Sequence, residues 1–189
     1  MKPIFEDKWG ELPVQVYETN EEIGMAAASE AREIINKAIS EKGVANIIVA
    51  TGNSQLTFLQ ALRELDQIDW GKVRVFHMDE YINLPEGHTA SFPYFLHKHF
   101  LDYLQVGAFY PVPGNPKTLR EDMFAYEKLL MDNPADLCAL GIGENGHIAF
   151  NDPPFADFDD PLFIKKVRLD DKSRRQQVGE GHFSSIEEV

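Results

Sequence analysis

Short apolar runs typical of buried strands alternate with longer segments of helical periodicity along this chain. The strand-type runs are residues 14–17, 45–50, 73–78 and 136–142, and the helical segments are residues 19–41, 56–65, 91–104 and 119–131. This alternation predicts an α/β fold: a three-layer, doubly wound, mainly parallel sheet with helices on both faces. In such a sheet, ligands bind beyond the carboxyl ends of the strands.

The overall composition favours one globular domain over residues 1–189, because no repeat or Gly/Ser-rich linker divides the sequence. The formal net charge of −13 disfavours nucleic acid and anionic membranes as partners. The single cysteine, Cys138, excludes an intrachain disulfide, and the apolar runs are too short to span a membrane. Because the N-terminal residues do not form the apolar core of a signal peptide, we expect a soluble, cytoplasmic protein.

The first chemically unusual strand end is formed by Thr51, Gly52, Asn53 and Ser54. A strand runs there into a glycine-containing turn and then into a helix, so free N–H groups and the helix dipole favour an anion. No Gly-Lys-Thr follows, which excludes a Walker A loop. The alternative, that Ser54 only caps the helix and Gly52 only turns the chain, stays open.

The second strand end carries two adjacent acids, Asp79 and Glu80. A carboxylate at a partly desolvated strand end can have a raised pKa and act as a general base. Taken alone, the pair fits a solvated acidic loop at least as well.

The third strand end is a glycine-rich loop that contains His147 and continues to Asp152. Gly143 and Gly146 permit close approach to a ligand, and a histidine can move protons near neutral pH. Asp152 can orient His147 only if a turn brings it back. A purely structural histidine is the alternative. The sequence has no Cys cluster or His-x-x-x-His pair, so we expect no metal.

In this order, the three segments resemble the glucosamine-6-phosphate deaminase (isomerase) family, which shares its fold with 6-phosphogluconolactonases. The most specific pieces are Met78-Asp-Glu-Tyr-Ile-Asn-Leu-Pro85, with His88 and Ser91 after it, and Gly146-His-Ile-Ala-Phe-Asn-Asp-Pro153. Lactonases typically carry Gly-His-Thr-Ala-Ser at the second piece. Residues 50–54 match the family's phosphate loop more loosely.

The resemblance implies conversion of a small phosphorylated sugar, glucosamine 6-phosphate, into fructose 6-phosphate and ammonia without a metal or organic cofactor. It implies that Asp79 moves a proton between C2 and C1, and that His147 assists ring opening. Residues 51–54 would hold the phosphate, and we also expect substrate contacts from Glu80 and Gly146.

The chain departs from the family pattern at two positions near the motif histidine. Asn145 stands where classical deaminases have Asp, and Asp152 stands where they have Glu. We expect Asn145 to hydrogen-bond without charge, and Asp152 to keep its charge on a shorter side chain. Arg174 and Arg175 are the local candidates for a phosphate-binding arginine.

The resemblance further implies that the C-terminal part of the fold lies beyond Val189. It leaves open whether the chain forms a homo-oligomer. Two other functions also stay open. One is a 6-phosphogluconolactonase or another hexose-phosphate isomerase. The other is a non-catalytic sugar-phosphate-binding module.

Overall fold

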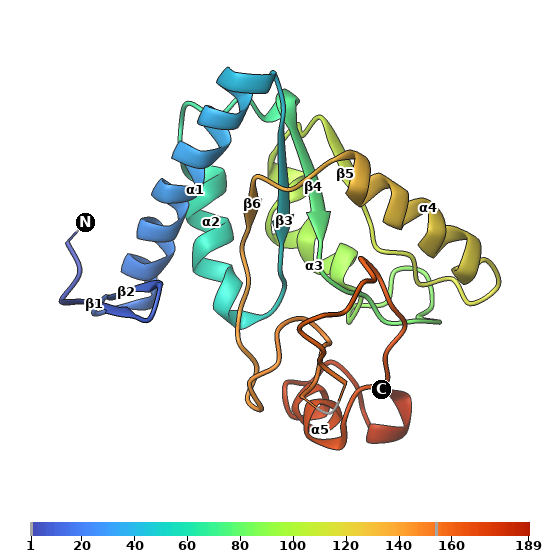
Figure 1. The fold of residues 1–189 in the computed structure, drawn as a ribbon. Coiled ribbons are helices and arrows are strands. Elements are labelled where there is room, and N and C mark those ends of the chain that lie inside the picture. Colours follow the sequence, from blue (N-terminus) through green and yellow to red (C-terminus); the bar gives the residue numbers. More distant parts are fainter. Residues whose placement is uncertain (1, 154) are drawn as a thin grey trace.

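The computed structural model describes residues 2–153 and 155–189 (Figure 1). The helices and strands follow in the order β1 (Phe5–Trp9), β2 (Leu12–Val16), α1 (Asn20–Lys42), β3 (Ala45–Val49), α2 (Leu56–Glu64), β4 (Val73–His77), α3 (Phe92–His99), β5 (Ala108–Tyr110), α4 (Leu119–Asp132), β6 (Leu137–Cys138) and α5 (Asp171–Gly179). No helix within these residues is both long and apolar enough to cross a bilayer.

The central sheet has four strands in the order β5-β4-β3-β6, and every neighbouring pair is parallel. Ala45 of β3 lies opposite Val73 of β4, and the pairing continues to Val49 opposite His77. The two central strands therefore end at the same level. This arrangement confirms the predicted parallel α/β sheet and places the segments after β3, β4 and β6 at one edge.

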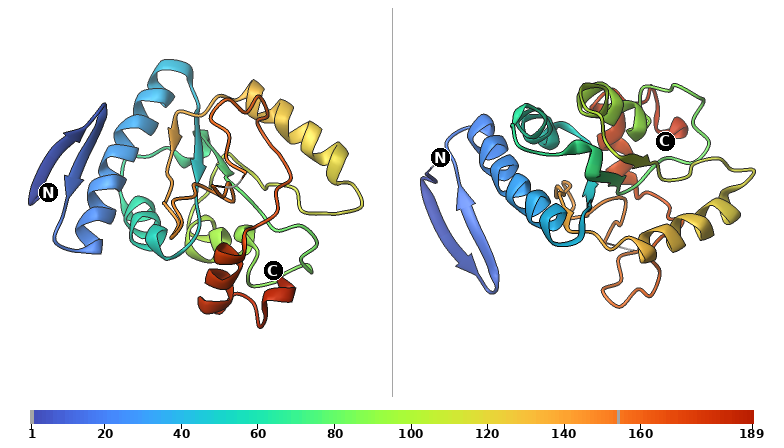
Figure 2. Two further views of the ribbon diagram at one scale, coloured as in Figure 1. Left: turned by 60° about the horizontal axis from the view of Figure 1, so that its bottom comes forward. Right: turned by 90° about the horizontal axis from the view of Figure 1, so that it is seen from above.

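Helices cover both faces of this sheet, as predicted (Figure 2). Ile47 and Val75 are fully buried on the face that packs against α1, α2 and α3. Phe76 points to the opposite face, where its ring meets Tyr126 of α4 edge-on at 6.3 Å. The alternation of side chains along a strand explains how β4 supplies apolar contacts to both layers.

The start of α2 is held in place by α1. A β-carbon at Gly24 of α1 would lie 2.6 Å from the backbone of Thr57, so only glycine allows this close approach. Burial of Ala28 and Ala31 on α1, and of Phe58 and Leu59 on α2, completes the contact. The loop between β3 and α2 is therefore anchored on both sides.

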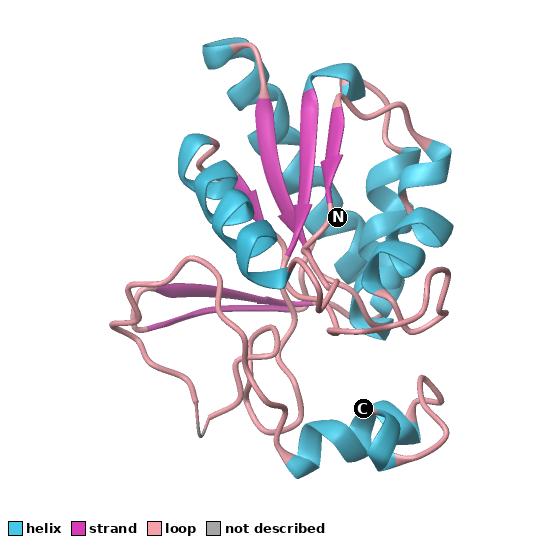
Figure 3. Cartoon of the chain, turned by 90° about the vertical axis from the view of Figure 1, so that its right-hand side faces the viewer, coloured by secondary structure: helices cyan, strands magenta, loops and turns pink. Residues whose placement is uncertain are grey.

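Several elements differ from the sequence-based expectation. Residues 136–142 are predicted as a buried strand, but only Leu137–Cys138 pairs with β3, and Cys138 is exposed. Residues 14–17 are predicted as the first strand of the alternation, but β1 and β2 form an antiparallel hairpin outside the central sheet. The short strand β5 and the polar helix α5 were not expected at all. Figure 3 shows α5 and the C-terminal residues below the sheet, away from the main helical layers. The segment that carries α5 faces the carboxyl ends of the strands.

Candidate functional site

A pocket of about 270 Å³ lies at the carboxyl ends of β3, β4 and β6. Its lining includes residues 51–54, Asp79 and His147, and so unites the three predicted strand-end segments. A volume of this size suits one small metabolite. The predicted convergence of these segments is therefore present in the fold.

The loop after β3 begins with Gly52, whose φ of +99° is readily accessible only to glycine. A 3-10 turn, Asn53–Gln55, then leads directly into α2. Ser54 lies inside this turn, and its hydroxyl accepts from Gln55 Nε2 at 3.1 Å rather than capping α2. The capping alternative for Ser54 is therefore wrong. The first N–H groups of the helical segment lack intrahelical acceptors and offer donors for an anion.

Asp79 follows β4 and has a strongly perturbed carboxyl group. Burial raises its pKa to about 7, while a hydrogen bond from the Phe150 backbone acts in the opposite direction and the Glu80 carboxylate adds to the rise. A carboxyl group with this pKa exchanges protons near neutral pH. The environment of Asp79 therefore matches that of a general base.

Glu80 has a different environment from its neighbour. Its carboxylate accepts from the Ser91 hydroxyl at 2.7 Å and from the Phe92 backbone at 3.2 Å, at the N-terminus of α3. Burial raises its pKa, and these hydrogen bonds work against the rise. Glu80 is not among the residues that line the 270 Å³ pocket, so this predicted substrate contact lies outside it.

The His147 loop depends on its glycines. A β-carbon at Gly143 would overlap the imidazole ring of His147, and the Gly143 backbone donates to the His147 carbonyl at 2.9 Å. Gly146 has a φ of +87°, and Ala149 adopts a φ of +53°, which is uncommon for a residue with a side chain. His147 and Ala149 line the pocket, whereas Gly146 does not.

The chain turns back after His147 and brings Asp152 beside it, as the sequence-based prediction required. Its Oδ1 lies 3.2 Å from Nδ1 of His147, and its side chain is fully buried. Burial alone raises the pKa of Asp152, but hydrogen bonds from Asn145, Ser173 and the Asp170 backbone lower it overall. Asn145 contacts the same imidazole, with Oδ1 2.6 Å from Nδ1. Asn145 and Asp152 therefore lie behind His147 and outside the pocket lining.

Helix α5 and the residues after it also contribute to the pocket, and no sequence pattern predicted them. Gln176, Gln177, Glu180 and His182 all line the pocket opposite the strand ends. Helix α5 begins with the N-cap Asp170, whose side chain accepts from the Ser173 backbone. This capping pattern was the one available signal, because the helix has no apolar stripe.

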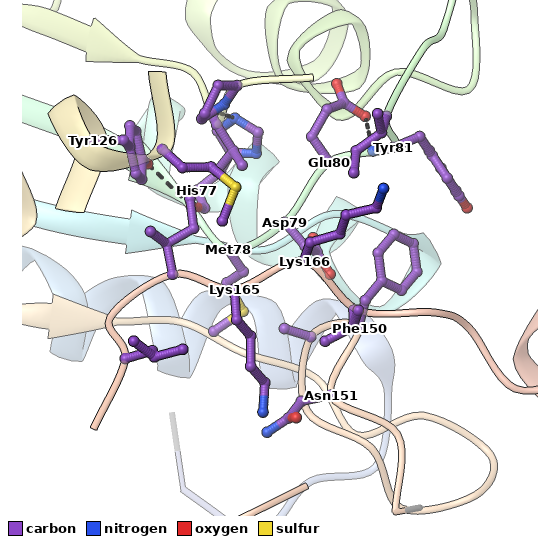
Figure 4. A pocket seen from close by; sticks show the side chains of 18 of the residues that line it. His77, Met78, Asp79, Glu80, Tyr81, Tyr126, Phe150, Asn151, Lys165 and Lys166 are labelled. Carbon is purple, nitrogen blue, oxygen red and sulfur yellow. Dashed lines mark hydrogen bonds between the residues drawn. The ribbon is translucent and has the colours of Figure 1, made fainter. Parts of the chain in front are cut away.

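A larger cavity of about 840 Å³ shares Met78, Asp79, Ala149 and Phe150 with the pocket. In Figure 4, His77, Met78 and Asp79 follow one another from β4 into this cavity, and Lys165 and Lys166 reach it from a later segment. Its wall also includes Arg174, which donates to the Ile186 carbonyl. Neither Arg174 nor Arg175 lines the smaller pocket.

Possible metal ligands are dispersed in the described part of the chain. No three His, Cys, Asp or Glu side chains gather there with the geometry to hold a metal ion. His77 is held within the sheet, since its Nε2 accepts from the Val112 backbone at 2.8 Å. Burial lowers the pKa of His77 to about 4, so its imidazole is neutral at pH 7.

Residues 18–153 match the family model described as glucosamine-6-phosphate isomerases/6-phosphogluconolactonase. The chain belongs to this family. A glucosamine-6-phosphate deaminase of Bacillus cytotoxicus is 36% identical over 142 residues, which are 75% of this chain and 52% of that protein. A glucosamine-6-phosphate deaminase of Bacillus cereus is 34% identical over 167 residues, which are 88% of this chain and 61% of that protein. This family member thus spans between half and two thirds of these relatives' length.

Solved structures of the family show the same fold. A monomeric glucosamine-6-phosphate deaminase superposes with a TM-score of 0.76 at 26% identity, over 91% of this chain and 70% of that one. A 6-phosphogluconolactonase from Shewanella baltica gives a TM-score of 0.60 at 23% identity, over 70% of this chain and 57% of that one. The second likeness speaks for the fold alone.

Proposed function

We propose that the pocket between the three strand ends binds glucosamine 6-phosphate and converts it, with water, into fructose 6-phosphate and ammonia. One observation carries this proposal: a glycine-containing loop at the start of a helical segment, a carboxyl group with a pKa of about 7 and a partly exposed histidine line the same small pocket. Family membership and the deaminases among its relatives support the choice of substrate.

In the proposed reaction, His147 opens the sugar ring. It takes the proton from the anomeric hydroxyl and delivers one to the ring oxygen as the C1–O5 bond breaks, which leaves the aldehyde. A histidine suits this task because it accepts and donates protons at neutral pH. The contacts of Asn145 and Asp152 with Nδ1 leave Nε2 as the working nitrogen.

Asp79 carries out the isomerisation. Its carboxylate removes the proton from C2 while the aldehyde oxygen takes up a proton from water, which gives an enolamine. The same carboxyl group then returns a proton to C1 as the amino nitrogen releases one to water, which gives the 2-imine. Water then adds to C2, and the C–N bond breaks with release of ammonia. Because burial raises the pKa of Asp79 to about 7, the group both accepts and returns a proton readily.

The phosphate is held by the Thr51–Ser54 loop in this proposal. The positive end of the helical segment and its free N–H groups supply the attraction. Within the described residues, no Lys or Arg side chain lines this pocket. Backbone donors and hydroxyl groups therefore account for the anion affinity assigned to this loop.

The test is a set of parallel assays on the 189-residue chain. Glucosamine 6-phosphate is offered first, and fructose 6-phosphate and ammonia are each measured. In D₂O, the proposed proton transfer must introduce deuterium at C1 of fructose 6-phosphate. Asp79→Asn must lower kcat by about 10²–10⁴-fold, whereas Asp66→Asn, the same change at an exposed position, must leave it unchanged.

Other outcomes would favour the alternatives. Acid release from 6-phosphogluconolactone, independent of Asp79 and without deuterium at carbon, identifies a lactonase. Calorimetric binding of sugar phosphates without any product identifies a non-catalytic binding module. Either result refutes the proposed deamination.

A further inference from the structure

The side-chain amide of Asn145 lies between two carboxylates. Its Nδ2 donates to Oδ1 of Asp152 at 2.9 Å and to Oδ2 of Asp170 at 3.0 Å. Ionised carboxylates only accept hydrogen bonds, so the two acids fix which end of the amide faces them. The remaining Oδ1 must face His147, where it accepts from the backbone N–H at 3.1 Å and lies 2.6 Å from Nδ1.

Asp170 reaches this amide from the first turn of α5. Its Oδ1 accepts from the Ser173 backbone at 2.8 Å, and its own backbone N–H donates to Oδ2 of Asp152 at 2.9 Å. The hydrogen bond from Ser173 lowers the pKa of Asp170 despite partial burial, and the Asn145 amide adds to this effect. One residue thus joins the α5 N-terminus to the loop that carries His147.

The atoms around Nδ1 of His147 are all acceptors. They are Oδ1 of Asn145, Oδ1 of Asp152 at 3.2 Å and Oγ of Ser173 at 3.3 Å. The Ser173 hydroxyl donates its proton to Asp152 at 2.6 Å, so its lone pairs remain for the imidazole. Nδ1 therefore carries the proton, and proton exchange is left to Nε2.

We propose that Asp170 is a positioning residue for His147: it fixes the orientation of the Asn145 amide, and the amide holds His147 in the tautomer with the proton on Nδ1. In its consequence for catalysis, this inference rests on the proposed function. It concerns a residue outside the motif that carries the family resemblance, on a helix that the sequence did not reveal.

The same geometry explains why an asparagine stands at position 145. An aspartate there would place a third carboxylate within hydrogen-bond distance of Asp152 and Asp170, and like charges this close cannot all stay ionised. Asn145 and Asp170 thus form a matched pair. The Asn145 amide takes the place beside His147 that an aspartate would otherwise occupy, and the Asp170 carboxylate lies behind this amide.

The decisive variant is Asp170→Ser, because serine still caps α5 but is too short to reach Asn145. Long-range ¹H–¹⁵N spectra of histidine-labelled protein report which ring nitrogen of His147 carries the proton, with His147→Gln as the assignment control. Because Asp152 and Ser173 still offer acceptors to Nδ1, we expect the variant to populate the second tautomer in part and to lose about two- to threefold in kcat with an almost unchanged KM. Asp170→Asn has a single side-chain oxygen, which cannot accept from both Ser173 and Asn145, so it must change the spectrum and kcat in the same direction as Asp170→Ser.

Asp171→Ser is the matched control, since it removes an exposed acid from the same helical turn. It must leave the spectrum and kcat unchanged. In an Asn145→Ala background, Asp170→Ser must add no further loss, because its effect passes through the amide. An unchanged spectrum in Asp170→Ser, an equal response in Asp171→Ser or a wild-type spectrum in Asp170→Asn overturns the inference.

Should Asp170→Ser not fold, the exchanged pair tests the same point, because asparagine also caps a helix well. Asn145→Asp must then lower kcat and alter the His147 spectrum, and adding Asp170→Asn must recover both in part. The spectra also separate the two proposals. If the chain shows no turnover but the His147 tautomer changes in the variants, the proposed function is refuted and the positioning role stands. If the chain turns over substrate but the tautomer does not change in the variants, the positioning role is refuted and the proposed function stands.

Discussion

The hydroxyl of Tyr81 donates a 2.7 Å hydrogen bond to Oε1 of Gln177, and both side chains are buried. Tyr81 follows the proposed base by two positions, and Gln177 belongs to α5. Around this bond, the Tyr81 ring packs against Phe150 and Phe183 at centroid distances of 5.0 Å. The segment that follows β4, residues 79–81, is thus joined to α5 by one hydrogen bond within an aromatic cluster.

Removal of this contact should weaken the fold. Tyr81→Phe leaves Oε1 of Gln177 buried without its donor, and we expect a loss of about 1–2 kcal/mol in the free energy of unfolding. Urea denaturation measures it. Tyr103→Phe is the control, because Tyr103 is 60% exposed and contacts Arg63 through its ring rather than its hydroxyl. Equal midpoints for the two variants would contradict the prediction.

The proposed base sets the pH dependence of activity. Because the pKa of Asp79 is raised to about 7 by burial, kcat/KM should rise with pH and level off above about 7. Asp79→Asn should lose about 10²–10⁴-fold in kcat and no longer show this rise. A wild-type profile that is flat between pH 5 and 8 would argue against Asp79 as the base.

The same carboxyl group should make the folded state less stable as pH rises. Its pKa is near 3.8 in an unfolded chain and about 7 in the folded one, so between these values the folded state binds more protons. Stability is therefore lost as pH increases from about 4 to 7. We expect Asp79→Asn to melt with the wild type at pH 4 and a few degrees above it at pH 8. A difference in Tm between Asp79→Asn and the wild type that stays constant from pH 4 to pH 8 would contradict this prediction.

Gly143 should be required for the position of His147 more than for folding. In Gly143→Ala, the new methyl group overlaps the imidazole and displaces it, so kcat should fall about 10²-fold. Gly179→Ala is the matched control, since open space surrounds that glycine in α5. It should keep full activity and gain slightly in Tm. Equal activity of the two variants would show that the ring tolerates the displacement.

The sequence predicted those elements whose patterns are strong and local. Residues 45–49 are apolar except for Asn46, and they are β3, buried on both faces. Strand β5 was missed because only three residues, ending before Pro111, pair with β4. Helix α5 was missed because it buries Ser173 and Gln177 rather than an apolar stripe, so hydrophobic periodicity gives no signal.

The site was predictable where chemistry follows a strand directly. Thr51–Ser54 and Asp79 come just after β3 and β4, and His147 lies in the longer loop that follows β6, so parallel pairing brings the three segments together. The surroundings of His147 were predictable only in part. Asp152 is close in sequence, but Asp170 reaches Asn145 across 25 positions, and only the folded chain reveals that contact.

The order of the strands also sets an order of assembly. β3 and β4 are joined by a single helix, whereas β6 is tied to β3 through Asn46 and Asp136, 90 positions apart. Because contacts close in sequence form earliest, and synthesis proceeds from the N-terminus, the anion loop and Asp79 fold first. The His147 loop and α5 then complete the pocket. We therefore expect a nascent chain to position residues 51–54 and Asp79 before His147 joins them.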